Sequence, residues 1–187
     1  MTEPAHTVAA DATAADVVRL LTGAGSTLAV AESLTGGALV AAIVDVPGAS
    51  RVLRGGVVAY ATDLKADLLD VPGELLAAHG AVHPDVAAAM AEGVRARLRA
   101  TWGVATTGVA GPDPQDGRPP GEYHVAVAGP DGVRVRSSAP AGPTTRPQVR
   151  AAARDGALAL LAQALADGAG PDAVDGPGTG GATGTLH

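Results

Sequence analysis

Short apolar runs alternate with segments of helical periodicity over most of the chain. The apolar runs are bounded by glycine, proline or polar residues, and we expect each of them to form a strand. The predicted strands are residues 28–31, 55–60, 102–106, 123–128 and 133–138. The predicted helices are residues 14–22, 38–46, 64–71, 83–100 and 148–166, with a further turn of helix and a loop within 72–80. Thr62 and Asp63 are a good N-cap pair for the third of these helices. This order of elements predicts an α/β domain.

The last two predicted strands are joined by a strong turn signal. Gly129-Pro130-Asp131-Gly132 separates them, which predicts an antiparallel hairpin. A loop is expected at 140–147, before the last helix. Strands 28–31 and 55–60 are each followed by a helix, so they run parallel if they are neighbours in the sheet.

The limits of the domain follow from a helix cap and from composition. Thr13 is a good N-cap, with Asp16 three residues later at the positive end of the helix, so residues 1–12 are expected to form a flexible arm. From residue 167 the chain consists almost entirely of small residues, which predicts a disordered glycine-rich tail over 167–187. The folded domain is therefore expected to span 13–166.

Composition excludes several classes of protein. With 187 residues, 47% of them hydrophobic, the chain has the length for one domain with a core of its own. No apolar run is long enough to span a bilayer, and the first residues lack the regions of a signal peptide, so we expect a cytoplasmic protein with no membrane contact. The lack of cysteine excludes disulfides and thiol nucleophiles. A net charge of −6 and only three aromatic residues argue against a nucleic-acid groove.

The most informative local pattern is T-L-A-V-A-E-S-L-T-G-G at residues 27–37. It predicts a buried strand that passes through a tight turn into a helix, so the Ser33 hydroxyl lies where open α/β sheets bind ligands. Gly36 and Gly37 in a first helical turn cost roughly 1 kcal/mol each relative to alanine, and close approach of a ligand to the backbone would explain that cost. The alternative is that Ser33 or Thr35 only caps the helix and the glycines only allow packing.

Twelve of the thirteen basic residues are arginine, and the remaining one is Lys65. A partly buried lysine can lose its proton near neutral pH and act as a base, whereas arginine cannot. Lys65 and Tyr60 come after the second predicted strand, so they emerge at the same sheet edge as Ser33 if the first two strands are parallel neighbours. The alternatives are a surface lysine retained by chance and a tyrosine that ends a strand with its hydroxyl in water.

Other polar residues carry weaker signals. His79 and His83 have the i, i+4 spacing of a metal pair, but Gly80 and Pro84 interrupt any shared helix. We therefore expect a loop residue and a helix cap, and no metal site.

A glycine-rich turn, T-G-V-A-G-P at 107–112, follows the third predicted strand. Its backbone can cradle an anion, although it is neither a P-loop nor a dinucleotide fingerprint. The polar loop 113–121 either covers a site or is a solvated connection. Arg146 and Arg150 flank the start of the last predicted helix, where they either reach a phosphate or carboxylate or are solvated at the surface.

Five motifs stand at these turns and helix starts. They are E-S-L-T-G-G at 32–37, V-A-Y-A-T-D-L-K at 58–65, H-G-A-V at 79–82, T-G-V-A-G-P at 107–112 and R-P-Q-V-R at 146–150. On these motifs, residues 12–166 resemble the CinA C-terminal domain family. The resemblance implies a three-layer α/β/α fold with a five-stranded mixed sheet of order 2-1-3-4-5 and an antiparallel fourth strand. The hairpin predicted from the turn agrees with that reversal.

Members of this family are nicotinamide-nucleotide amidohydrolases. The resemblance therefore implies hydrolysis of the carboxamide of nicotinamide mononucleotide to nicotinate mononucleotide and ammonia, without a metal or organic cofactor. It implies that Ser33 is the nucleophile, Lys65 the base and Tyr60 an assisting residue. The substrate-binding residues that it implies are Thr35, Gly36, Gly37, Thr107, Gly108, Ala110, Gly111 and Arg146. It also suggests a homodimer.

The chain departs from the family pattern at three places. Leu34 replaces a cysteine in the turn, Pro114 and Gln115 replace glycines, and Glu122 replaces a threonine. The last two changes fall in or beside the loop expected to line the pocket.

Two functions of other classes are alternatives to the hydrolase, a nucleotide-binding regulator associated with competence or DNA damage and a protein-interaction module of DNA uptake or repair. The second has no basic face or aromatic groove in its favour.

Overall fold

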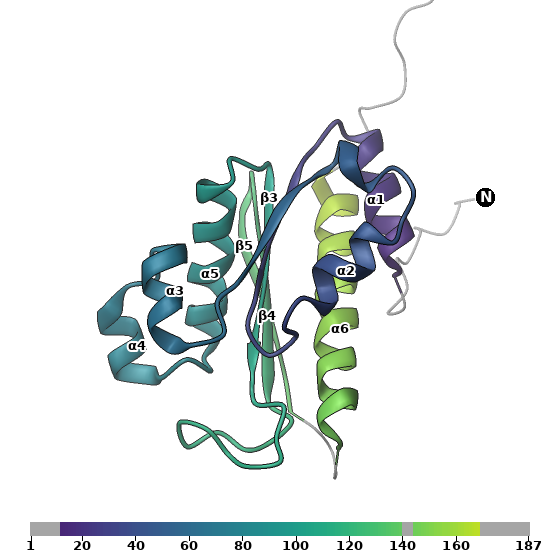
Figure 1. Cartoon of the computed structure of the whole chain (residues 1–187). Coiled ribbons are helices and arrows are strands. Elements are labelled where there is room, and N and C mark those ends of the chain that lie inside the picture. The colour runs from purple at the N-terminus through teal and green to yellow at the C-terminus, as the bar shows by residue number, and fades with distance from the viewer. Residues whose placement is uncertain (1–11, 140–143, 169–187) are drawn as a thin grey trace, which may run out of the picture.

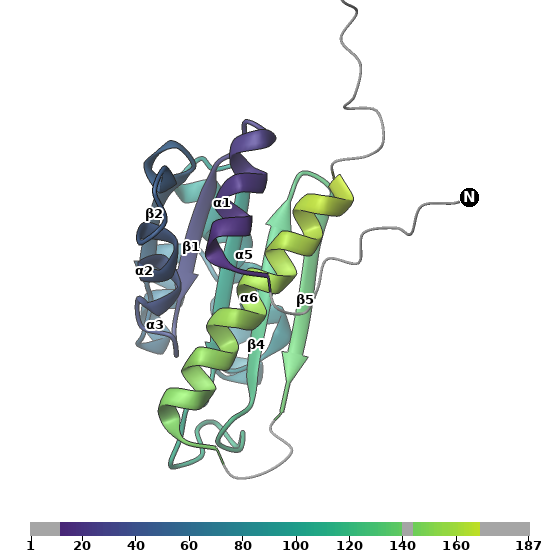
Figure 2. The same cartoon turned by 90° about the vertical axis from the view of Figure 1, so that its right-hand side faces the viewer.

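A five-stranded sheet lies between two layers of helices (Figure 1). The computed structural model describes residues 12–139 and 144–168. Its strands are β1 (Leu28–Glu32), β2 (Leu53–Val58), β3 (Trp102–Gly108), β4 (Tyr123–Gly129) and β5 (Gly132–Ser138). Its helices are α1 (Ala14–Gly23), α2 (Ala38–Val44), α3 (Thr62–Leu69), α4 (Gly73–His79), α5 (Pro84–Arg97) and α6 (Arg146–Gly168), with a 3-10 turn at Ala49–Arg51. Helices α1, α2 and α6 cover one face of the sheet, and α3, α4 and α5 lie on the other (Figures 1 and 2).

The sheet has the order β2-β1-β3-β4-β5. β1 runs parallel to both β2 and β3, and β4 is antiparallel to β3 and β5, so the expected order, the mixed sheet and the hairpin are all confirmed. The last residue of β1, Glu32, pairs with Val58 and with Thr106. The carboxyl ends of the first three strands therefore meet at one edge of the sheet, as parallel neighbours require.

Both faces of the three central strands, β1, β3 and β4, are buried, which explains their continuous apolar runs. Every residue of β1 is buried. Val30 packs into the core beneath α1, α2 and α6, whereas Ala29 and Ala31 pack on the α5 side. The small residues of that second face let α5 approach closely, because a Cβ atom added at Gly103 of β3 would lie 2.1 Å from the carbonyl oxygen of Ala91 in α5.

Some element boundaries differ from those predicted. β2 begins at Leu53 and ends at Val58, so Tyr60 lies after the strand. Thr62 and Asp63 were expected to cap α3, but the N-cap is Ala61, which makes no side-chain cap bond. The helix therefore begins at Thr62, and Asp63 lies in its first turn, where its charge suits the helix dipole.

The folded part extends slightly beyond the expected domain limits at both ends. Thr13 caps α1 in a reciprocal capping box with Asp16, as expected of a cap at this position. Helix α6 continues to Gly168 and so includes two residues that we assigned to the tail; an ion pair between Arg134 of β5 and Asp167 holds this end. Ala12, assigned to the arm, packs against the core. The rest of the predicted arm and tail, residues 1–11 and 169–187, lies outside the described residues.

None of the helices within 12–139 and 144–168 combines the length and the hydropathy needed to cross a bilayer.

Candidate active site

Ser33 and Lys65 meet at the carboxyl edge of the sheet. Ser33 follows β1 directly, and Lys65 projects from the first turns of α3. The Lys65 side chain is fully buried, and its Nζ lies 3.2 Å from Ser33 Oγ. The same Nζ donates to the carbonyl oxygen of Ala59 at 2.9 Å and to that of Tyr60 at 3.5 Å. The two residues singled out in the sequence on separate grounds are therefore in hydrogen-bonding contact.

Burial changes the acidity of the Lys65 amine. Desolvation lowers the pKa of Lys65 from 10.5 to about 8, and the nearby carboxylates of Asp116 and Asp63 oppose part of that shift. A neutral amine has two N–H bonds and one lone pair. Because the carbonyls of Ala59 and Tyr60 accept the two N–H bonds, the lone pair is left to accept the Ser33 hydroxyl proton.

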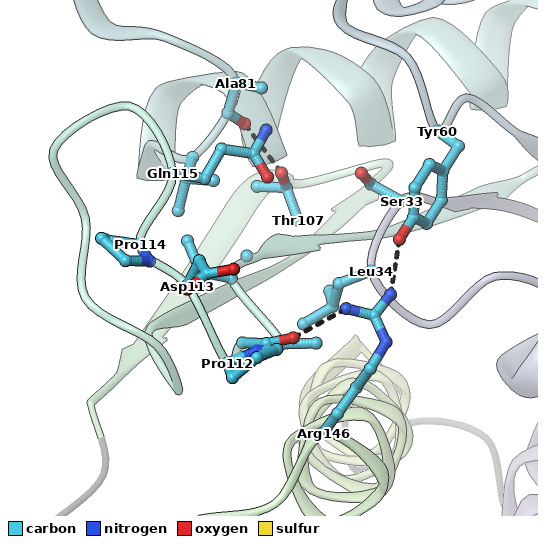
Figure 3. Close-up of a pocket in the computed structure, with 15 residues that line it drawn as sticks. Ser33, Leu34, Tyr60, Ala81, Thr107, Pro112, Asp113, Pro114, Gln115 and Arg146 are labelled. Atoms are coloured by element: carbon cyan, nitrogen blue, oxygen red, sulfur yellow. Dashed lines mark hydrogen bonds between the residues drawn. The ribbon is translucent and has the colours of Figure 1, made fainter.

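A cavity of about 400 Å³ opens beside Ser33 (Figure 3). It is lined by Ser33, Leu34, Tyr60, Ala81, Val82, residues 107–115 and Arg146. The lining combines apolar residues with polar ones, and its charged side chains are Asp113 and Arg146, of which Arg146 is the cation. The cavity can therefore hold a small molecule with an anionic group at one end and an uncharged group near Ser33.

Arg146 joins three segments at the mouth of this cavity. Its Nη2 donates to the Tyr60 hydroxyl at 2.6 Å, and its Nη1 donates to the Gly111 carbonyl at 2.9 Å (Figure 3). The Tyr60 side chain is 56% exposed, and its hydroxyl is directed to Arg146. Tyr60 therefore contacts Lys65 through its backbone carbonyl.

The residues expected to bind substrate divide into two groups. Those that line the cavity are Thr107, Gly108, Ala110, Gly111 and Arg146. Those that do not are Thr35, Gly36 and Gly37. The Thr35 hydroxyl is fully buried and bonded to the Thr106 hydroxyl at 2.7 Å, so it faces the protein interior. Arg150, expected at a phosphate or in solvent, donates instead to the carbonyls of Leu34 and Thr35 and so holds this turn.

The N-terminus of α2 is capped by Glu32, a residue that the sequence analysis missed. Its carboxylate is 1% exposed and accepts the N–H groups of Gly37 at 2.9 Å, Leu39 at 3.0 Å and Val40 at 2.8 Å. The proposed capping by Ser33 or Thr35 is therefore wrong, and these N–H groups are not free for a ligand. The available signal was a lone carboxylate ending an apolar strand just before a helix start.

The loop after β3 forms one wall of the cavity. Asp113, Pro114 and Gln115 line it, so two of the residues that depart from the family pattern face the site. Glu122 does not line it; its carboxylate lies 3.4 Å from Arg118 and 3.3 Å from His124 Nε2. Of the two roles considered for this loop, covering a site is the one that the structure supports.

The two histidines with metal-pair spacing lie outside this cavity. Their rings stack at 4.2 Å, His79 ends α4, and His83 caps α5 by accepting the Asp85 N–H at 3.2 Å. The cap expected at His83 is confirmed. In the part of the chain that the structure describes, no three potential ligands gather around one point.

With this geometry in place, residues 10–165 also match the sequence profile of the CinA C-terminal domain. The chain belongs to the CinA C-terminal domain family. A CinA-like protein of Frankia casuarinae is 54% identical over 150 residues, which are 80% of this chain and 34% of that protein. The chain thus spans about a third of the length of the curated relatives it matches.

Solved structures of the CinA superfamily share the fold. A CinA superfamily protein from Klebsiella pneumoniae is 30% identical, with a TM-score of 0.78, and the match covers 82% of this chain and 96% of that one. A competence/damage inducible protein from Agrobacterium tumefaciens is 35% identical, with a TM-score of 0.74, over 81% of this chain and 96% of that one. The family resemblance drawn from the five motifs is confirmed.

Proposed function

We propose that this CinA family member is an amidohydrolase that converts nicotinamide mononucleotide to nicotinate mononucleotide and ammonia. One observation carries the proposal: the buried Lys65 amine lies 3.2 Å from Ser33 Oγ, with two backbone carbonyls placed to orient its lone pair. Serine is a poor nucleophile at its own pKa and needs a base within hydrogen-bonding distance. Lys65 supplies that base without a second ionisable group.

The reaction proceeds through an acyl-enzyme. Ser33 Oγ attacks the carboxamide carbon while its proton passes to Lys65 Nζ, and a tetrahedral intermediate forms. When this intermediate collapses, the C–N bond breaks and the Lys65 ammonium returns the proton to the leaving nitrogen, which departs as ammonia. Water then attacks the ester with Lys65 again as base, and nicotinate mononucleotide is released.

The oxyanion needs a hydrogen-bond donor other than the start of α2, whose N–H groups are bonded to Glu32. The N–H of Leu34 has no acceptor within the described residues, and Leu34 lines the cavity. Donors of this kind often come from the residue after the nucleophile. We therefore assign the Leu34 N–H to the oxyanion. Loss of one such donor typically costs roughly 3 to 4 kcal/mol in transition-state stabilisation.

The substrate's phosphate is assigned to Arg146. Guanidinium has five N–H donors, and Arg146 uses one to Tyr60 and one to Gly111 in the structure. The remaining donors suit a phosphate, which would place the nucleotide along the cavity with its carboxamide toward Ser33. A pyridine nucleotide is therefore the small-molecule partner that we propose, with no role for nucleic acid.

The test is release of ammonia from nicotinamide mononucleotide by the purified chain. We expect Ser33→Ala and Lys65→Arg each to lower kcat by about 10³-fold or more, because one removes the nucleophile and the other replaces the base by a group that stays protonated. Ser50→Ala, at an exposed serine of the 3-10 turn, is the matched control and should keep full activity. Near-normal turnover by Lys65→Arg would refute the role of Lys65 as the base. If the wild type binds nicotinamide mononucleotide but releases no ammonia, a regulatory nucleotide-binding domain is favoured.

A further inference from the structure

The loop that lines the cavity turns back on itself at residues 115–118. Gln115 and Arg118 exchange backbone hydrogen bonds of 3.1 and 2.8 Å. The two residues between them, Asp116 and Gly117, have positive φ angles of 50° and 74°, as in the tight turns of β-hairpins. The loop therefore contains a defined turn whose first residue, Gln115, faces the cavity.

Asp116 attaches this turn to the segment between α4 and α5. Its carboxylate accepts the N–H of Ala81 at 3.1 Å. The carbonyl of the same Ala81 accepts the Thr107 hydroxyl at 2.7 Å. A Cβ atom added at Gly80 would lie 2.8 Å from Asp116 Cβ, so the glycine leaves room for the carboxylate to reach Ala81. Ala81 is thus held from both sides by residues of the β3–β4 region.

These contacts position one wall of the cavity. Ala81, Thr107 and Gln115 all line it, and Figure 3 shows Gln115 beside Ala81 and Thr107, with Asp113 and Pro114 on the same side. Asp116 itself does not line the cavity. It therefore acts on the site through the residues that it holds.

Asp116 also acts on the proposed base. Two carboxylates raise the pKa of Lys65 against the larger effect of burial, Asp116 from the loop and Asp63 from α3 itself, and Asp116 has the greater influence. The other groups at the Lys65 amine are uncharged, namely the Ser33 hydroxyl and two backbone carbonyls.

We propose that Asp116 is a positioning residue, which docks the loop 113–115 on Ala81 as a cavity wall. The docking follows from the contacts alone. A secondary consequence is that the Asp116 charge opposes the lowering of the Lys65 pKa, and its test rests on the amidohydrolase function proposed above. Asparagine is the informative substitution, because it tolerates a positive φ and keeps an oxygen acceptor but has no charge.

Hydrogen exchange of the Ala81 amide tests the docking without any assay of activity. We expect this amide to exchange about tenfold or more faster in Asp116→Ala than in the wild type, because its acceptor is removed, and to remain protected in Asp116→Asn. Equal exchange in all three proteins would overturn the docking. Circular dichroism of each variant shows whether the fold is kept.

The pH profile of kcat/KM tests the charge. Asp116→Asn should move the acidic limb of the profile to lower pH, because the pKa of Lys65 falls when a neighbouring negative charge is removed. Asp63→Asn should shift the limb in the same direction by a smaller amount and leave Ala81 exchange unchanged. Asp67→Asn, at an exposed residue of α3, is the charge control and should alter neither measurement.

The two tests separate failure of this proposal from failure of the proposed function. An unshifted limb in an active Asp116→Asn enzyme overturns the effect on Lys65. If the wild type releases no ammonia, the amidohydrolase proposal and the effect on Lys65 fail together, whereas the docking is still decided by Ala81 exchange. A rise in KM for Asp116→Ala, rescued in Asp116→Asn, would show that the docked wall contacts substrate.

Discussion

Lys65 is held in an environment that is unfavourable for its charge. The side chain is fully buried, and no ion pair joins it to a carboxylate within the described residues. Burying a cation without a charged partner lowers the stability of a fold, so an apolar residue of similar size at this position would destabilise the protein less. A perturbed amine beside a hydroxyl in a cavity is instead typical of a catalytic group.

The lowered pKa of Lys65 predicts how activity depends on pH. Burial brings that pKa to about 8, and only the neutral amine can accept the Ser33 proton. Below this pH most molecules carry the ammonium, so kcat/KM should rise with pH through an apparent pKa near 8 and then level off. Ammonia release measured between about pH 6 and 10 gives the profile. A flat profile across that range would contradict the assignment of Lys65 as base.

Single residues were predictable from the sequence where chemistry or rarity distinguished them. Lys65 stood out as the lone lysine and Ser33 as a hydroxyl at a strand end, and the structure brings them into contact. The direction of the Tyr60 side chain was not predictable, because its partner Arg146 lies 86 residues away in the sequence. Glu32 was missed because its signal, a lone carboxylate between an apolar strand and a helix start, does not show which backbone N–H groups the carboxylate accepts.

At the scale of elements, α2 depends on a residue outside itself. It has seven residues, and an isolated helix of that length is not stable in water. Its N-cap, Gly37, has a left-handed conformation with no side chain, and the Glu32 carboxylate supplies the missing acceptors. The same contact fixes the turn that begins with Ser33.

Glu32→Gln should therefore destabilise the protein and disturb the site. The amide keeps one acceptor oxygen but directs an NH₂ group at backbone N–H donors, so we expect the free energy of unfolding to fall by about 2 to 3 kcal/mol. Thermal unfolding followed by circular dichroism measures this. Glu74→Gln, at an exposed residue of α4, is the control and should change stability by less than about 0.5 kcal/mol. Equal stability of the two variants would show that Glu32 is not a required cap.

The helices and strands were largely predictable, because helices show apolar residues at helical spacing whereas strands show short continuous apolar runs. The strands and the Gly129–Gly132 hairpin appear where short apolar runs and turn residues indicated them. The ends of elements were less accurate, because tertiary contacts extend or shorten them. The ion pair between Arg134 and Asp167 lengthens α6 into a segment that composition alone assigned to a disordered tail.

At the scale of the whole molecule, the cavity is assembled from distant parts of the chain. The ends of β1, β2 and β3, the α4–α5 connection and the start of α6 each contribute a wall (Figure 3). The sheet order implied by the family resemblance made the meeting of these three strand ends predictable, because parallel strands end at the same edge of a sheet. The contribution of α6 was expected only from the family resemblance, through Arg146, because nothing in a local pattern says where the first turn of a terminal helix will lie.

Arg146 provides a test of this assembly, because it is the cation of the cavity in a chain whose net charge is −6. Arg146→Gln should lower kcat/KM for nicotinamide mononucleotide by about 10- to 100-fold, since a charge-assisted bond to the phosphate is lost. Nicotinamide riboside, which has no phosphate, should show a similar loss with the wild type and little further loss with Arg146→Gln. Arg19→Gln removes the same charge from the exposed surface of α1 and controls for the overall field of the protein. If the loss caused by removing the phosphate and the loss caused by Arg146→Gln multiply when the two changes are combined, the phosphate binds away from Arg146. The nucleotide would then lie in the cavity in another orientation.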